Sequence, residues 1–339
     1  MRRLILSLAA ILCGCIAMNA QTERSQVVEG GGTGPYKAQV VKDASLERFT
    51  VYRPQDLKAA VKEAGRLPVI LYANGGCANE NIQMRYLLSE VCSYGYLAIA
   101  IGPYDEADFF ARWRGTLQRS ANTAKTQVMA NGEVVPHLSE AEKRAMEADL
   151  RRQRTQGQGG QPRQATYPRM LLEALDWLTD RNADPESEYH HTVDLERIAA
   201  MGQSCGGAQV LGVAHDPRIT TCIILNSGIG DMTMQGVTPA SLANLHTPML
   251  YLIGGPADVA YPNAAKDFER ISDLPVVMIN TLDGHEGTYY ETHGGAYAVT
   301  VHDWLDWQLK GCTGSSALFL NDEYFRMKRP EWSIVRKNY

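Results

Sequence analysis

Residues 197–215 read RIAAMGQSCGGAQVLGVAH, and they carry the clearest fold signal in the chain. A short apolar run of strand type leads directly into GQSCG, centred on Ser204, and a helical pattern follows it. These five letters fit G-x-S-x-G, in which a sharp turn between a strand and a helix raises a serine hydroxyl above a sheet. Glycine is needed on both sides of the serine, because the strand and helix backbones approach each other closely there. The strand before the motif and the helix after it therefore indicate Ser204 as a nucleophile.

Short apolar, β-branched segments alternate with helix-length segments on both sides of this motif. Such alternation predicts an α/β domain with a mostly parallel sheet and helices on both of its faces. The central segments are almost uninterrupted hydrophobic, which is typical of strands buried on both faces. The expected strands are 38–41, 48–52, 67–73, 97–101, 197–202, 219–226, 248–254 and 275–281. We expect one domain over 37–339, preceded by a flexible, glycine-rich leader at 21–36.

A nucleophilic serine needs a base, and the base needs an acid that orients it. In a fold with this turn, the acid and then the histidine follow the serine along the chain. Asp258 follows the expected strand 248–254, and His285 follows the expected strand 275–281. The sequence therefore predicts Ser204, Asp258 and His285 as a catalytic triad. The alternatives are a turn-capping role for the aspartate and a plain surface position for the histidine.

Three other residues compete for the roles of base and acid. His293 lies just ahead of an expected helix, where a capping or loop role is more natural. Asp231 would be the acid if that role had moved one strand earlier in the chain. Asp283 is too near His285 along the chain to reach its ring from the usual side.

Acyl transfer also requires donors for the negative charge that develops on the carbonyl oxygen. One donor is the backbone N–H after the nucleophile, which here belongs to Cys205. The second is expected after an early strand, where NGGC at 74–77 offers the N–H of Cys77 or of Gly76. The alternative is a glycine turn without a catalytic role. If both cysteines donate to one oxygen, their Cα atoms fall near the roughly 4.4–6.8 Å that a disulfide requires, although two independent buried residues remain the alternative.

An insertion at about 105–165 separates the expected strand 97–101 from the next helix, and it is too long for an ordinary connection. It leaves the sheet at the edge where open α/β sheets bind ligands, so we expect it to border the site as a lid. Tyr104 and Trp113 would then offer apolar contact to the substrate. Residues 151–164 lack apolar side chains and indicate a mobile surface loop, the alternative to a lid for this half.

Several segments together resemble the α/β-hydrolase superfamily, in particular its dienelactone-hydrolase-like and cutinase-like polyesterase branch. The similar segments are NGGCANEN at 74–81, GQSCGG at 202–207, GGPADVAYPNA at 254–264, DGHEGTYY at 283–290 and YAVTVHDWLDWQLKG at 297–311. The resemblance implies an α/β-hydrolase fold and a serine ester hydrolase that needs no cofactor. The histidine loop reads H-E-G where the polyesterases have apolar residues and proline, which leaves the substrate open. A peptidase or acyl-peptide hydrolase with the same triad, or a non-catalytic ligand-binding domain, are the alternatives.

The first residues, MRRLILSLAAILCGCIAMNA, have the layout of a secretory signal at 1–20. The letters LCGC also read as a lipobox, which would leave Cys15 as a lipid anchor. We therefore expect an exported protein, periplasmic or extracellular, with no transmembrane segment. The formal net charge of −5 without a long basic run argues against nucleic acid as a partner, and no Cys/His spacing predicts a metal.

Overall fold

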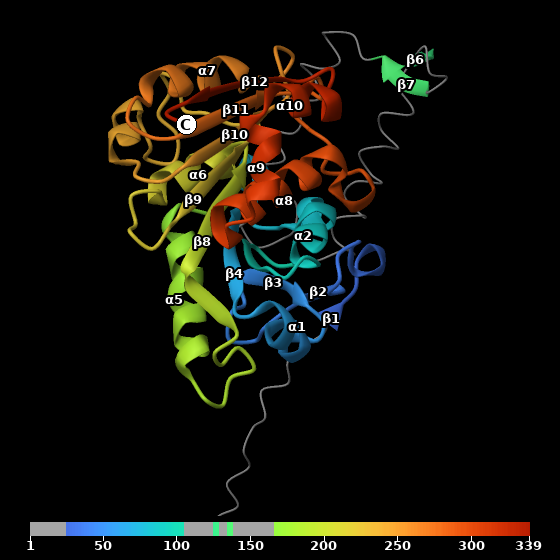
Figure 1. Ribbon diagram of the computed structural model, residues 1–339, viewed down its shortest axis with the longest axis vertical. Helices are drawn as coiled ribbons and strands as arrows, with labels where there is room; N and C mark the ends of the chain where they lie inside the picture. The colour runs from blue at the N-terminus through green and yellow to red at the C-terminus, as the bar shows by residue number, and fades with distance from the viewer. Residues whose placement is uncertain (1–24, 105–124, 129–133, 138–165) are drawn as a thin grey trace, which may run out of the picture.

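A ten-stranded sheet runs through the protein (Figure 1). The computed structural model describes residues 25–104, 125–128, 134–137 and 166–339. From edge to edge the strand order is β1-β2-β3-β5-β4-β8-β9-β10-β11-β12. The central strands, from β5 to β11 in this order, are parallel, whereas β1, β2, β3 and β12 pair antiparallel. The bounds are β1 Ser25–Gln26, β2 Ala38–Val41, β3 Phe49–Pro54, β4 Leu67–Ala73, β5 Leu97–Ile101, β8 Val193–Gln203, β9 Thr221–Leu225, β10 Met249–Ile253, β11 Val276–Asn280 and β12 Ser333–Lys337.

Helices cover both faces of this sheet. Buried residues of α1, α5, α6 and α7 pack on one face, and those of α2, α8, α9 and α10 pack on the other. The bounds are α1 Leu57–Ala64, α2 Arg85–Cys92, α5 Arg169–Ala183, α6 Cys205–Val213, α7 Tyr261–Arg270, α8 Gly295–Lys310, α9 Thr313–Leu320 and α10 Asp322–Lys328. Short 3-10 turns are η1 Glu29–Gly31, η2 Gly75–Cys77, η3 Ile82–Met84, η4 Pro239–Asn244 and η5 Thr292–Gly294. The predicted α/β class with a mostly parallel sheet is confirmed.

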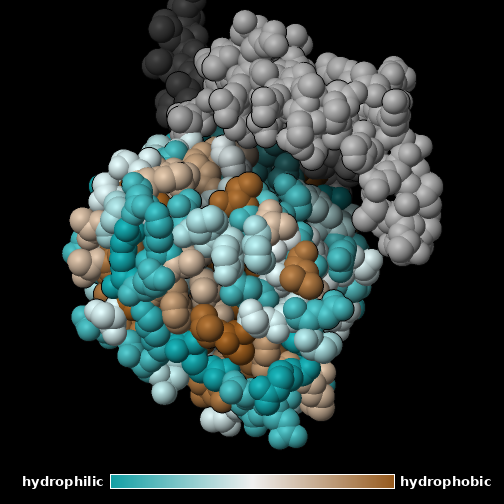
Figure 2. All heavy atoms as spheres, turned by 90° about the horizontal axis from the view of Figure 1, so that it is seen from above, coloured by the Kyte–Doolittle hydropathy of each residue, from teal (hydrophilic) through white to brown (hydrophobic). Residues whose placement is uncertain are grey.

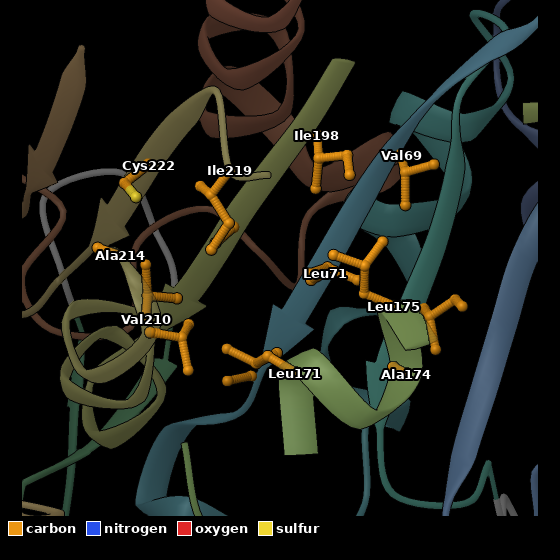
Figure 3. Packing of buried hydrophobic residues seen from close by; sticks show 14 of the residues in the cluster. Val69, Leu71, Leu171, Ala174, Leu175, Ile198, Val210, Ala214, Ile219 and Cys222 are labelled. Atoms are coloured by element: carbon orange, nitrogen blue, oxygen red, sulfur yellow. The ribbon is translucent and has the colours of Figure 1, made fainter. Parts of the chain in front are cut away.

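Strand β4 shows why an uninterrupted apolar sequence forms the centre of this sheet. Every residue of LPVILYA is buried, because helices cover both faces. Side chains alternate along a strand, so Val69 and Leu71 join the core under α5 and α6, while Ile70 and Tyr72 join the core under α2 and α8. Figure 3 shows the first of these cores, with α5 lying against β4 and β8.

The register of the parallel strands sets the place of the site. Gln203 of β8 lies opposite Leu225 of β9, which lies opposite Leu252 of β10. Ile253 in turn lies opposite Asn280 of β11. Because parallel strands end at the same edge, the loops that follow β8, β9, β10 and β11 are neighbours.

The structure differs from expectation at both ends of the described chain. Residues 25–36, expected as part of a loose leader, are packed: β1 pairs with β2, and the Thr33 amide donates to a carboxylate oxygen of Glu90 at 2.9 Å. The terminal strand β12 pairs with β11 and was not expected from the sequence. Within the expected insertion, β6 Lys125–Val128 and β7 Val134–His137 form an antiparallel pair. The expected signal at 1–20 with Cys15, Trp113 and the 151–164 loop lie outside the described residues.

Exposed apolar side chains are scattered over the surface. In the view of Figure 2, brown hydrophobic groups form separate small patches among hydrophilic ones. Two of the most exposed are Val259 (75%) and Leu282 (66%), which lie on the loops that follow β10 and β11. In the part of the chain that the structure describes, no helix has the length and apolarity to cross a membrane.

Candidate active site

Ser204 occupies a sharp turn between β8 and α6. Its backbone has φ 52° and ψ −121°, a conformation that costs free energy for any residue with a β-carbon. The Ser204 amide donates to the carbonyl oxygen of Leu225 at 2.9 Å, which ties the turn to the end of β9. The serine side chain is therefore held at the sheet edge by backbone geometry.

Three glycines allow this turn to exist. A β-carbon on Gly202 would overlap with the carbonyl group of Gly206, and one on Gly206 would overlap with the carbonyl group of Ala73 in β4. A β-carbon on Gly207 would overlap with the Ser227 side chain. Helix α6 thus lies directly against β8 and the neighbouring loops, as the G-x-S-x-G sequence predicts.

The structure brings Ser204, His285 and Asp258 together in one hydrogen-bonded chain. His285 Nε2 lies 3.0 Å from Ser204 Oγ, and His285 Nδ1 lies 2.6 Å from Asp258 Oδ1. The three residues follow β8, β11 and β10, in agreement with the loops expected from the sequence. Asp258 is buried, with 1% of its surface exposed, while the His285 side chain is 27% exposed. The serine end of the chain is therefore open to a ligand and the acid end is closed.

Four donors surround the carboxylate of Asp258. Oδ1 accepts from His285 Nδ1 and from the Ala260 amide at 2.9 Å, and Oδ2 accepts from the Gly254 amide at 3.0 Å and Asn226 Nδ2 at 2.8 Å. Burial by itself raises the pKa of this carboxyl group, but these hydrogen bonds outweigh it and hold the pKa of Asp258 below its usual value. Asp258 is consequently a carboxylate at neutral pH.

The charge of Asp258 acts in turn on His285. The hydrogen bond that His285 donates to the Asp258 carboxylate raises the pKa of the imidazole above its usual value, against the opposing effect of burial, and the nearby Glu286 adds to the rise. Since an ionised carboxylate can only accept, Nδ1 carries the hydrogen and Nε2 has a free lone pair toward Ser204. The arrangement can thus take a proton from the serine hydroxyl.

Sequence reasoning missed two residues that support this chain. Asn226, the residue after β9, donates to Asp258 and also to the carbonyl oxygen of Gly284 at 2.9 Å. Gln203, the residue before the nucleophile, donates from Nε2 to the carbonyl oxygen of His285 at 3.3 Å. Their positions in the sequence could have identified them. Both are polar residues at the carboxyl ends of expected parallel strands, and ligands bind at that edge of such a sheet.

Cys77 and Cys205 form a disulfide beside Ser204, with their Cα atoms 5.2 Å apart. Cys77 ends η2, the NGGC turn after β4, and its backbone has φ 48°. Its carbonyl oxygen accepts from Thr166 Oγ1 at 2.8 Å, and its sulfur accepts from Gln235 Nε2 at 3.0 Å. The disulfide therefore joins the expected oxyanion turn to the first residue of α6, and the proximity predicted from the sequence is confirmed.

The structure places the competing residues in other surroundings. His293 Nδ1 lies 3.4 Å from carboxylate oxygens of both Glu29 and Glu90, close to the packed leader. Asp231 is 61% exposed as a side chain and pairs with Lys266 and Arg270 of α7.

Tyr104 differs from its expected role as a substrate contact. It is only 2% exposed and packs edge-on against Tyr52, with ring centroids 6.5 Å apart. The buried Tyr104 ring is not at the exposed position that a substrate contact requires, so the predicted substrate-binding role of Tyr104 is wrong. Among the residues that the structure describes, no group of histidine, cysteine, aspartate or glutamate side chains could hold a metal ion.

Comparison with known proteins gives a short likeness only. No family model matches the chain. A protein named hydrolase ffsE, from Aspergillus flavipes, is 43% identical over 54 residues. The match covers 16% of this chain, and the chain spans 12% of the length of that relative.

Proposed function

We propose that this protein is a serine hydrolase of the α/β-hydrolase fold, which cleaves carboxylic esters through an acyl-enzyme intermediate. The observation that carries the proposal is the chain from Ser204 Oγ to His285 Nε2 and from His285 Nδ1 to Asp258. Its members follow the order serine, acid, histidine along the sequence, which is the order of this fold. The name of the short relative agrees with a hydrolase in general.

The geometry supports a two-step reaction. His285 Nε2 accepts the proton of Ser204 as the hydroxyl oxygen attacks the ester carbonyl carbon, and Asp258 stabilises the resulting imidazolium. The tetrahedral intermediate then collapses, and His285 gives the proton to the leaving alcohol. In the second step His285 takes a proton from water, whose oxygen attacks the acyl carbon. When this second intermediate collapses, His285 returns the proton to Ser204 Oγ and the carboxylic acid is released.

Two backbone groups are suited to bind the oxyanion. Cys205 is the first residue of α6, and the first amides of a helix have no acceptor within the helix. We assign the second donor to the Cys77 amide, with the neighbouring Gly76 amide as the alternative within the same turn. The disulfide between the two cysteines supports this assignment, because it holds the η2 turn against the start of α6.

The disulfide also bears on the compartment. Disulfides persist in oxidising environments and are rare in reducing ones. The Cys77–Cys205 bond therefore supports export through the expected signal at 1–20, to the periplasm or outside the cell, with or without a lipid on Cys15. The substrate of the exported enzyme would be an ester on a small molecule or on a polymer.

A panel of substrates tests the proposal. Wild type should hydrolyse 4-nitrophenyl esters, and Ser204→Ala should lose this activity while its unfolding transition is unchanged. Ser316→Ala, a serine of α9, is the matched control and should keep wild-type activity. Matched amides separate ester from peptide hydrolysis, since a peptidase would cleave them at comparable rates. Wild-type activity in Ser204→Ala contradicts the proposal.

A further inference from the structure

Asn226 lies at the point where the acid loop and the histidine loop meet. It is fully buried and directly follows β9, and its backbone N–H donates to the carbonyl oxygen of Leu252 in β10 at 2.8 Å. Its backbone has φ 44°, a left-handed conformation that asparagine tolerates better than most residues. The side chain is thereby directed between Asp258 and the turn before His285.

Every hydrogen-bonding group of this side chain has a partner. Nδ2 donates one hydrogen to Asp258 Oδ2 at 2.8 Å and one to the Gly284 carbonyl oxygen at 2.9 Å. Both of these partners can only accept, so the amide orientation follows from chemistry. The amide oxygen accepts from the hydroxyl of Tyr289, which is also buried and packs edge-on against Tyr297.

We infer that Asn226 is a positioning residue for catalysis, held in orientation by Tyr289, and that it fixes Asp258 and His285 relative to each other. The inference rests on the proposed function. One side-chain amide bonds the acid itself and the residue directly before the base, so its loss removes one hydrogen bond from each loop at once. Asp258 keeps its two backbone donors, from Gly254 and Ala260, but these belong to its own loop and do not reach the histidine loop.

A second contact shows how closely the two loops fit. A β-carbon on Gly254, at the start of the acid loop, would overlap with the carbonyl group of Gly284. The Gly284 amide also donates to the Gly254 carbonyl oxygen at 3.0 Å. The backbones of the two loops are therefore in direct contact at Gly254 and Gly284, and the Asn226 side chain adds a hydrogen-bonded link from Gly284 to Asp258.

The test compares Asn226→Asp with Asn226→Gly. Asn226→Asp keeps the size, the acceptor for Tyr289 and the tolerance for positive φ, but replaces both donor hydrogens by an oxygen. Asn226→Gly removes the side chain without straining the backbone. We expect kcat of both variants to fall about 10-fold to 100-fold at pH 8, as for a lost hydrogen bond to a charged group, with KM within twofold. Near wild-type kcat in both variants would contradict the inference.

The pH dependence gives an independent readout. In Asn226→Asp, two carboxyl groups face each other, and repulsion raises the pKa of the pair. At low pH the added carboxyl is protonated and donates to Asp258, whereas at high pH it ionises and repels it. The ratio of wild-type to variant kcat should therefore grow as pH rises. The other groups that act on these residues are His285, Glu286, Tyr289 and Tyr297, and burial raises the pKa of both tyrosines, which stay neutral.

Tyr289→Phe and Tyr251→Phe complete the design as a matched pair. Both tyrosines are buried, but Tyr251 of β10 contacts Asp267 at 3.4 Å on the opposite face of the sheet. We expect kcat to fall several-fold in Tyr289→Phe and to stay unchanged in Tyr251→Phe. If Ser204→Ala is inactive but Asn226→Asp keeps a kcat within twofold of wild type at every pH, the inference fails alone. If Ser204→Ala is active, the proposed function fails first.

Discussion

Reduction of the Cys77–Cys205 disulfide should weaken both catalysis and folding. A dithiol such as dithiothreitol supplies two electrons and two protons, which leaves two protein thiols and a cyclic disulfide of the reagent. The bond lies between the two amides that we assign to the oxyanion, and its Cα atoms are 5.2 Å apart. Once it is open, the η2 turn is free to move away from α6.

The structure sets the size of both effects. Loss of one oxyanion donor costs about 10²-fold to 10³-fold in kcat. The bonds from Thr166 and Gln235 to Cys77 remain after reduction, so we expect the lower end, about 100-fold. The disulfide also closes a loop of 128 residues, and chain entropy assigns about 5 kcal/mol of stability to a loop of this length.

The assay measures kcat for an activated ester before and after reduction, at a temperature where circular dichroism shows that both forms are folded. Urea unfolding gives the stability of each form. Cys312→Ser provides the background, because Cys312 is the exposed free cysteine of the described chain and its thiol would otherwise be available for exchange with the Cys77–Cys205 disulfide. If the fully reduced, folded protein keeps the kcat of the oxidised form, the disulfide does not hold the oxyanion site.

The pKa of His285 and the close packing at Gly206 each have a measurable consequence. As pH falls, kcat/KM should drop with a midpoint above pH 6.5, because Asp258 raises the pKa of His285 and the imidazole must be neutral to act as a base. A pH profile with this midpoint below pH 6.5 would contradict the prediction. Gly206→Ala should destabilise the fold by about 3 kcal/mol, because the added methyl group overlaps with the Ala73 carbonyl group. Gly314→Ala in α9 meets open space and should stabilise the fold by up to about 1 kcal/mol. Urea unfolding of the two variants measures the difference, and equal stabilities would show that the close approach of α6 to β4 beside Ser204 is not required.

Local patterns in the sequence predicted the centre of the fold well. The sequence predicts β4 and β5 at their observed bounds. A strand buried on both faces is an unbroken apolar run, so the first and last apolar residues mark where it begins and ends. The G-x-S-x-G turn could be predicted because its glycines are demanded by short-range backbone contact.

Features that depend on distant partners could not be predicted. β12 reads SIVRK and is partly exposed, and its pairing with β11 is decided by tertiary contacts rather than by its own pattern. The leader looked loose because its composition is polar, yet Glu90 of α2 supplies the partner for Thr33. Asn226 has no sequence signal beyond its position at the end of an expected strand, and only the meeting of two loops shows which groups it bonds.

Covalent labelling of Ser204 distinguishes an activated nucleophile from an ordinary serine. A fluorophosphonate reacts with a serine that a neighbouring base has activated, and mass spectrometry of the digested protein locates the adduct. We predict one label per wild-type molecule, on the peptide that contains Ser204. Ser204→Ala should carry no label on this peptide, and His285→Ala should be labelled at a rate that falls with its esterase activity. An active esterase that carries its label on another residue, or that is not labelled at Ser204, would contradict the account.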